Sequence, residues 1–94
     1  MEKFSLSAFL KKASLNDRLS ATHISLYAAI YSLWEQSQFS VWFKISRRQL
    51  MILSKLASTA TYHKCLKDLV DLGYLKYEPS YNHYKGSQVK ITGI

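Results

Sequence analysis

Hydrophobic residues recur at the spacing of an α-helix over residues 20–36 and again over residues 46–73. The first segment has two neighbouring apolar stripes, one running through Tyr27 and the other through Ile30. An apolar arc of this width is typical of a helix that is covered on two sides. Residues 20–36 are therefore predicted to form the central helix of the domain.

Residues 46–73 are predicted to form two helices joined by a short turn. Ser46 followed by Gln49 has the form of a capping box, which marks the start of the first helix. The turn is expected around residues 54–57, which contain no glycine. The first helix is expected to bury a stripe made of Leu50, Leu53 and Leu56.

The second helix of this pair is expected to begin after Ser58, a good capping residue, and to end at Gly73. On a helical wheel one side is apolar and consists of Tyr62, Leu66 and Leu69, with Cys65, Val70 and Leu72 at its margin. The opposite side carries Ala60, Lys64 and Lys67, flanked by Thr61 and His63. Small, hydroxyl and basic residues on an exposed face suit a helix that lies in the major groove of DNA.

Alternating residues predict strands after this helix pair and before it. Residues 74–78 and 88–92 alternate as the two strands of a hairpin, with a polar loop between them. Residues 39–45 alternate as a third strand, whose inward set is Phe39, Val41, Phe43 and Ile45. Helix, turn, helix and hairpin in this order predict a mainly α fold with a small antiparallel β-sheet, a winged helix-turn-helix.

Residues 1–15 are predicted to add a short amphipathic helix to this three-helix core and three-stranded sheet. Its apolar positions are Phe4, Leu6, Phe9, Leu10 and Ala13. This helix either packs on its own domain or pairs with a second copy of the chain. In the second case Trp42, which faces away from the predicted core set, is a candidate for the same homodimer interface.

Charge is distributed unevenly along this single domain of residues 1–94. The net charge is +7; residues 1–43 hold four basic and three acidic groups, and residues 44–94 hold nine basic and three acidic groups. The positive charge therefore coincides with the helix pair and the hairpin, as expected for an electrostatic contact with nucleic acid.

The residues from Ser54 onward carry a resemblance to a known family. The run S-K-L-A-S-T-A-T-Y-H-K-C, followed by G-Y-L-K-Y-E-P-S-Y-N and K-G-S-Q-V, resembles small winged-helix regulators of bacterial mobile genetic elements. The same residues resemble, more distantly, the N-terminal domain of the primosomal protein DnaD. The resemblance covers residues 22–92 and implies sequence-specific binding of double-stranded DNA, in transcription regulation or in the control of a mobile element.

The expected DNA contacts fall into three groups. Base edges and phosphates are assigned to the second helix of the pair, through Ser58, Thr59, Thr61, His63, Lys64 and Lys67. Phosphates are assigned to the first helix and the turn, through Arg47, Arg48 and Lys55. The hairpin, or wing, is expected to contribute Tyr84, Lys85 and Lys90.

Other chemistry is not expected. The six acidic residues are not paired for acid–base work, and His63 and Cys65 lie about 200° apart on a helix, which prevents a shared metal ion. We therefore predict no enzyme activity, no metal and no cofactor. One cysteine, no secretory signal and no long apolar run predict a cytoplasmic protein without a membrane segment. The alternative function is a winged-helix module that binds a protein partner in a replication or recombination complex.

Overall fold

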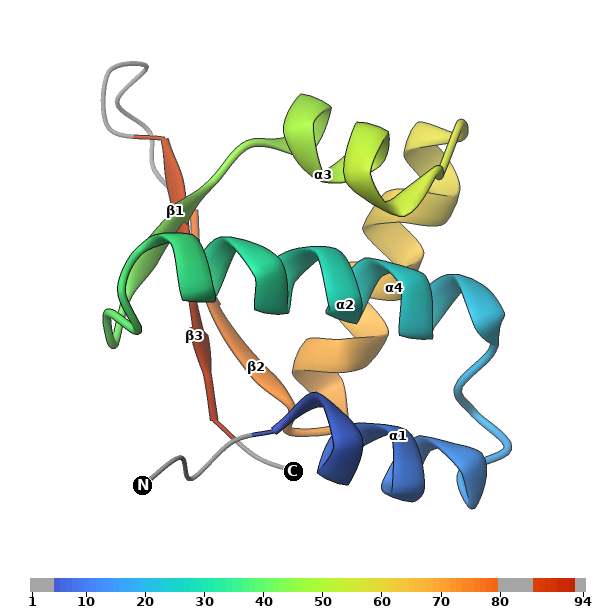
Figure 1. Ribbon diagram of the computed structural model, residues 1–94. Coiled ribbons are helices and arrows are strands. Elements are labelled where there is room, and N and C mark those ends of the chain that lie inside the picture. The colour runs from blue at the N-terminus through green and yellow to red at the C-terminus, as the bar shows by residue number, and fades with distance from the viewer. Residues whose placement is uncertain (1–4, 80–85, 93–94) are drawn as a thin grey trace.

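The computed structural model describes residues 5–79 and 86–92 (Figure 1). Within these residues the helices are α1 (Leu6–Ser14), α2 (Ala21–Gln36), α3 (Arg47–Ser54) and α4 (Thr59–Asp71). The strands are β1 (Phe43–Ile45), β2 (Leu75–Glu78) and β3 (Ser87–Ile91). The prediction of a mainly α chain with a small antiparallel sheet is confirmed. No helix in the described ranges is long and apolar enough to cross a membrane.

The sheet places the last strand in its centre, in the order β1-β3-β2. Both neighbours run antiparallel to β3, with Phe43 opposite Val89 and Leu75 opposite Ile91. These four side chains are buried on the face that is turned toward the helices. The expectation that a third strand joins the hairpin is confirmed, because β1 covers the edge of β3 that β2 leaves open.

Helix α2 is the centre of the fold. It packs against α1, α3, α4 and β1, and its Leu26, Tyr27 and Ile30 are fully buried (Figure 1). The wide apolar arc of residues 20–36 therefore has the two-sided cover that the sequence predicted.

Helix α1 packs on its own domain. The Ser5 hydroxyl accepts a hydrogen bond from the backbone N–H of Ala8 and caps the helix. Phe9 is fully buried; its ring stacks on Tyr27 at a centroid distance of 3.7 Å and meets Tyr74 edge-on at 5.2 Å. Phe9 is thus unavailable to a second copy of the chain. Phe4 lies outside the described residues; among the described members of the proposed homodimer set, Leu10 and Trp42 are exposed.

The predicted buried stripe of the first helix is wrong at Leu53, and at Leu56 it is right about burial but not about the helix. Leu53 is exposed rather than part of a buried stripe, because the buried residues of α3 are Leu50 and Ser54, one turn apart, and Leu53 lies on the side of the helix that faces solvent. The Ser25 hydroxyl of α2 donates a hydrogen bond to the backbone carbonyl of Ser54 at 2.5 Å. Leu56 is buried, but it follows the helix and does not belong to it.

The predicted strand over residues 39–45 is shorter than expected. Gln38 and Phe39 both have positive φ angles, +61° and +63°, and the Phe39 N–H donates to the carbonyl of Trp34 at the end of α2. The chain therefore reverses where alternation predicted an extended strand, and Phe39 and Val41 are exposed. Only residues 43–45 pair with the sheet.

Candidate nucleic-acid interface

Helix α4 has the two-sided character that the wheel predicted. Its buried residues are Tyr62, Cys65, Leu66 and Leu69. Its exposed residues include Ala60, His63, Lys64 and Lys67. The helix begins at an N-cap in which the Ser58 hydroxyl accepts a hydrogen bond from the backbone N–H of Thr61 at 3.2 Å. A small and basic face is therefore presented to solvent along the first three turns.

Two carboxylates further along α4 hold the lysines of this face. The ammonium of Lys64 lies 3.1 Å from Oδ2 of Asp68, and that of Lys67 lies 2.7 Å from Oδ2 of Asp71. Both lysine side chains are nevertheless about three-quarters exposed, at 73% and 75%. Ion pairs of this exposed i,i+4 type are weak, so either ammonium can exchange its carboxylate for another acceptor.

Asp68 has a second partner on α2, the buried His23. The His23 Nδ1 accepts a hydrogen bond from the backbone N–H of Ser20, which places the ring proton on Nε2. Nε2 then donates to Oδ2 of Asp68 at 2.7 Å. The hydrogen bond from His23, followed by that from Lys64, lowers the pKa of Asp68 below its ordinary value. His23 thus fixes the start of α2 against the middle of α4.

A groove lies where the start of α3, the start of α4 and the inner face of the hairpin meet. Its volume is about 430 Å³, and its lining is Ile45, Ser46, Arg47, Arg48, Tyr62, His63, Tyr77 and Ser87. We call it the helix groove. Arg47 and Arg48 are the first two residues of α3, where the unpaired backbone N–H groups add partial positive charge. Within the described residues no carboxylate forms an ion pair with either arginine.

The helix groove continues along α4 into a second depression of about 280 Å³. This depression shares His63 and Tyr77 with the first and adds Leu66, Lys67 and Val70. Tyr77 stands at the junction, with its hydroxyl 3.1 Å from the hydroxyl of Ser87. Burial raises the pKa of Tyr62 to about 12, so its hydroxyl remains a hydrogen-bond donor at neutral pH. The combined surface offers guanidinium, imidazole, ammonium and hydroxyl donors on one side of the molecule.

The structure brings together some of the predicted contact residues and separates others. Arg47, Arg48 and His63 meet in the helix groove, and Lys67 lines its continuation. Lys55 and Ser58 are exposed between α3 and α4, Thr59 is exposed at the first position of α4, and Thr61 is half-buried. Tyr84 and Lys85 lie outside the described residues.

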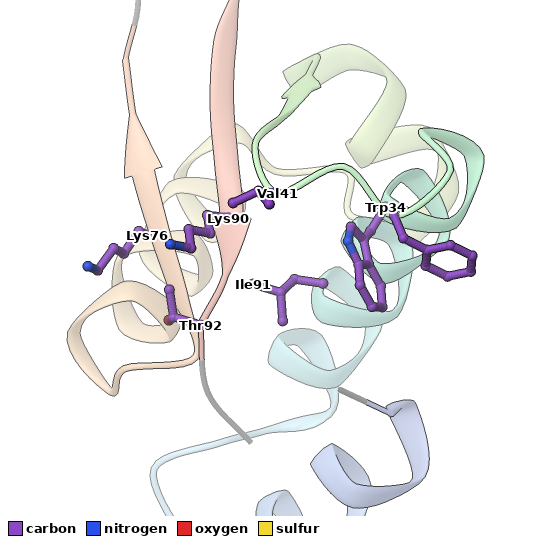
Figure 2. A pocket seen from close by; sticks show the side chains of 7 residues that line it. Trp34, Val41, Lys76, Lys90, Ile91 and Thr92 are labelled. Carbon is purple, nitrogen blue, oxygen red and sulfur yellow. The ribbon is translucent and has the colours of Figure 1, made fainter. Parts of the chain in front are cut away.

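Lys90 belongs to a different surface from the rest of the predicted set. It lies on the outer face of the sheet, directly opposite Lys76 on β2 (Figure 2). The helix groove, by contrast, includes Tyr77 and Ser87, which alternate with these lysines along β2 and β3 and so belong to the inner face. Lys90 therefore lies on the sheet face opposite to the helix groove, because side chains of adjacent residues in a strand point in opposite directions. Its contact with DNA as part of the wing stays a prediction.

Five groove residues were not predicted as contacts: Ile45, Ser46, Tyr62, Tyr77 and Ser87. Tyr77 lies two residues after Leu75 on β2. The two do share a sheet face, but Leu75 is buried and Tyr77 is partly exposed at the far end of the strand, where the helices no longer cover the sheet. The available signal was the tyrosine itself, an apolar ring with a polar tip that suits the edge of a core.

No group of three or more potential metal ligands occurs among residues 5–79 and 86–92. Comparison of the chain with protein-family models, with curated proteins and with solved structures gives no significant match.

Proposed function

We propose that this protein binds double-stranded DNA as a winged helix-turn-helix, with α4 in the major groove and the start of α3 on the phosphate backbone. The observation that carries the proposal is the helix groove: two arginines without an acidic partner lie beside the exposed small and basic face of α4. The resemblance described above suggests regulation of transcription or of a bacterial mobile element as the setting.

The groove suits a phosphate for two reasons. A guanidinium presents several N–H donors in a plane and matches the oxygens of a phosphate, which favours Arg47 and Arg48 as backbone contacts. The α3 N-terminus adds backbone N–H groups and the positive end of the helix dipole at the same place. A phosphate bound here would hold α4 at a constant depth in the adjacent groove of the duplex.

Lys64 is the residue that we assign to base recognition. It lies in the second turn of α4, and an ammonium can bond to the O6 and N7 acceptors of guanine in the major groove. When Lys64 leaves Asp68 for a base, the carboxylate keeps its hydrogen bond from His23. The exchange therefore does not leave a carboxylate without a partner, which lowers the cost of moving the lysine.

The test separates base recognition from general attraction to DNA. Selection from a random duplex pool supplies a preferred site, and the wild type, Lys64→Ala and Lys67→Ala are then titrated against that site and a scrambled duplex. We expect Lys64→Ala to cost about 1–3 kcal/mol on the preferred site and less on the scrambled one. Lys67→Ala is the matched control, since Lys67 has the same exposed i,i+4 pairing one turn further along. It should weaken both duplexes equally.

If selection enriches no sequence, specific recognition is ruled out. If Lys64→Ala weakens both duplexes by the same factor, α4 does not read bases through this residue. Circular dichroism checks the fold of each variant, because replacement of one exposed lysine should leave stability within about 0.5 kcal/mol.

A further inference from the structure

The outer face of the sheet carries a second concentration of positive charge. Lys76 and Lys90 are directly opposite each other in the antiparallel register of β2 and β3. Lys44 lies on the same face through its pairing with Gln88, and Glu78 is the acidic residue that shares it. Like charges in opposite positions of a strand pair are unfavourable. The fold therefore maintains a repulsive pair that a bound anion would relieve.

An apolar wall stands beside this lysine pair. Lys76 and Lys90 line a pocket of about 520 Å³ together with Trp34, Phe39, Val41, Ile91 and Thr92 (Figure 2). We call it the outer-sheet pocket. The Phe39 ring meets Trp34 edge-on at a centroid distance of 4.9 Å and is still 51% exposed. In Figure 2 Trp34 stands on one side of the pocket, and Lys76 and Lys90 stand on the other.

The backbone places Phe39 there at a cost. Its φ angle of +63° lies in the left-handed region, which is unfavourable for a bulky side chain, and Gln38 before it has a similar angle. Strained residues of this kind persist where the surrounding structure holds them, and they concentrate at binding sites. Here the strained segment carries an exposed aromatic ring to the rim of a pocket rather than into the core.

We propose that the outer-sheet pocket binds a short acidic segment of a partner protein. A carboxylate of that segment lies between the ammonium groups of Lys76 and Lys90, and a neighbouring aliphatic or aromatic side chain packs against Phe39 and Val41. The combination of one charged pair and one apolar wall matches a peptide in which an acid adjoins an apolar residue. The proposal is independent of DNA binding, because Lys76 and Lys90 lie on the sheet face opposite to the helix groove and the two sites share no lining residue.

The pocket fits a peptide better than a nucleic-acid strand. Single strands are bound along a track of successive aromatic platforms and basic residues. The outer-sheet pocket is one open depression with one substantially exposed ring, Phe39, which suits a single anchoring side chain. Its cations are lysines, which act as point charges, and not the arginines that are used for planar recognition of phosphate.

The experiment starts from the full chain immobilised and offered to a displayed library of short random peptides. We expect enrichment of sequences in which an aspartate or glutamate adjoins a leucine or an aromatic residue. The best sequence is synthesised with a fluorescent label and titrated by anisotropy. The variant K76A/K90A should bind it at least about tenfold more weakly, since it loses both charge-assisted contacts. Phe39→Ala should also weaken it.

The matched control is K11A/K12A, which removes two exposed lysines from the last turn of α1 and so makes the same change in net charge. It should bind the peptide as the wild type does. The charge-reversed variant K76E/K90E should instead bind a peptide whose acids are replaced by lysines, which shows that a loss does not come from misfolding.

Three results would overturn the proposal: a library that yields no enriched peptide, enriched peptides without an acid, or equal losses in K76A/K90A and K11A/K12A. A labelled oligothymidine strand provides the competing outcome. If this strand binds, and K76A/K90A abolishes that binding but not peptide binding, the pocket is a single-strand site and not a peptide site.

Discussion

The two basic surfaces of this protein differ in which cations they use and in what lies next to them. The helix groove combines two arginines with tyrosine and serine hydroxyls and an imidazole. The outer-sheet pocket combines two lysines with a wall of aromatic and aliphatic side chains. Both surfaces attract anions, but only the first offers polar donors throughout. The excess positive charge of the chain, which has a net charge of +7, therefore contributes to two separate surfaces that suit different ligands.

This difference shows how far charge counting can be taken. A count along the chain assigns Lys90 to the same patch as the arginines, whereas the strand register assigns it to the opposite face of the sheet. The sign of a charge predicts a class of ligand, and the neighbours of the charge decide between members of that class.

The largest effect is expected when DNA binding is compared between variants that lose two charges from one surface or from the other. We expect R47A/R48A to weaken duplex DNA binding on the order of 100-fold, because hydrogen bonds to charged groups contribute about 1.5–3 kcal/mol each. We expect a plot of log affinity against log salt concentration to have a slope on the order of −4 to −5 for the wild type. For R47A/R48A this slope should be less steep by about two. K76A/K90A, which removes the same charge, should leave both quantities nearly unchanged. Fluorescence titrations over a range of salt concentrations measure them.

An equal reduction of the slope in both double variants would break the comparison. It would mean that the duplex contacts the outer sheet face as well, and that Lys90 contacts DNA as the sequence predicts. K11A/K12A controls for the general effect of net charge on DNA attraction.

The hydrogen bond between His23 and Asp68 joins α2 to α4 and should contribute to stability. Asp68→Ala leaves the Nε2 proton of the buried His23 without an acceptor, and an unsatisfied buried donor costs about 1–3 kcal/mol. Asp71→Ala removes an otherwise similar i,i+4 pair without such a partner and should change stability much less. Urea unfolding of both variants measures the difference. If the two variants unfold at the same midpoint, His23 is not held through Asp68.

Low pH should weaken the same hydrogen bond between His23 and Asp68. The pKa of Asp68 is lowered in the folded chain from its ordinary value of 3.8 by the hydrogen bond from His23 and then by that from Lys64. A carboxyl with a lowered folded pKa contributes stability that is complete above its unfolded value and is lost as the pH falls through the folded value. The stability gap between wild type and Asp68→Ala should therefore narrow below pH 3.8. A gap that stays constant to low pH would contradict this.

The smallest effects are expected at the strained turns that border the two surfaces. Lys55 ends α3 with a φ of +64°, and Gln38 follows α2 with a φ of +61°. Replacement of either by glycine should stabilise the fold by about 1 kcal/mol, because glycine adopts this conformation without steric cost. Lys55→Gly should also weaken duplex binding a few-fold through loss of its charge. Gln38→Gly should leave DNA and peptide binding unchanged.

Gly73 supplies the opposite control for these turns. It ends α4 with a φ of +89°, where Gly73→Ala should destabilise the chain by about 1 kcal/mol. Thermal unfolding of the three variants orders them. Should Lys55→Gly lower stability, the Lys55 side chain contributes packing or charge interactions that outweigh its backbone strain.

The parts of the fold that were predictable are those in which local signals agree. Helix α4 has a serine cap, a clean apolar side and a terminal glycine, so its buried and exposed residues could be assigned from the wheel. Helix α2 showed its central place through the width of its apolar arc. The arginines of the helix groove were also predictable, because Ser46 places them at the start of a helix.

The remaining features depend on information that no local window holds. His23 and Asp68 are 45 residues apart, and nothing near either one indicates the other. The chain reverses at Phe39 without a glycine, so no local residue indicates that the strand predicted over residues 39–45 begins only at Phe43. The exposure of Leu53 depends on which side of α3 packs on α2, the side that carries Leu50 and Ser54. The meeting of Lys76 with Lys90 requires the strand register.

The central position of β3 also has a consequence for the order of assembly during synthesis. β1 and β2 do not pair with each other, and each finds its partner only in β3, the last of the three to be translated. Until residues 87–91 emerge from the ribosome, both earlier strands have unpaired edges and the inward side chains of β2 have no sheet to join. The helices can form early, but the sheet is complete only when β3 pairs with β1 on one side and with β2 on the other. A nascent chain stalled just before Ser87 would thus be a target for chaperones or for pairing with another copy.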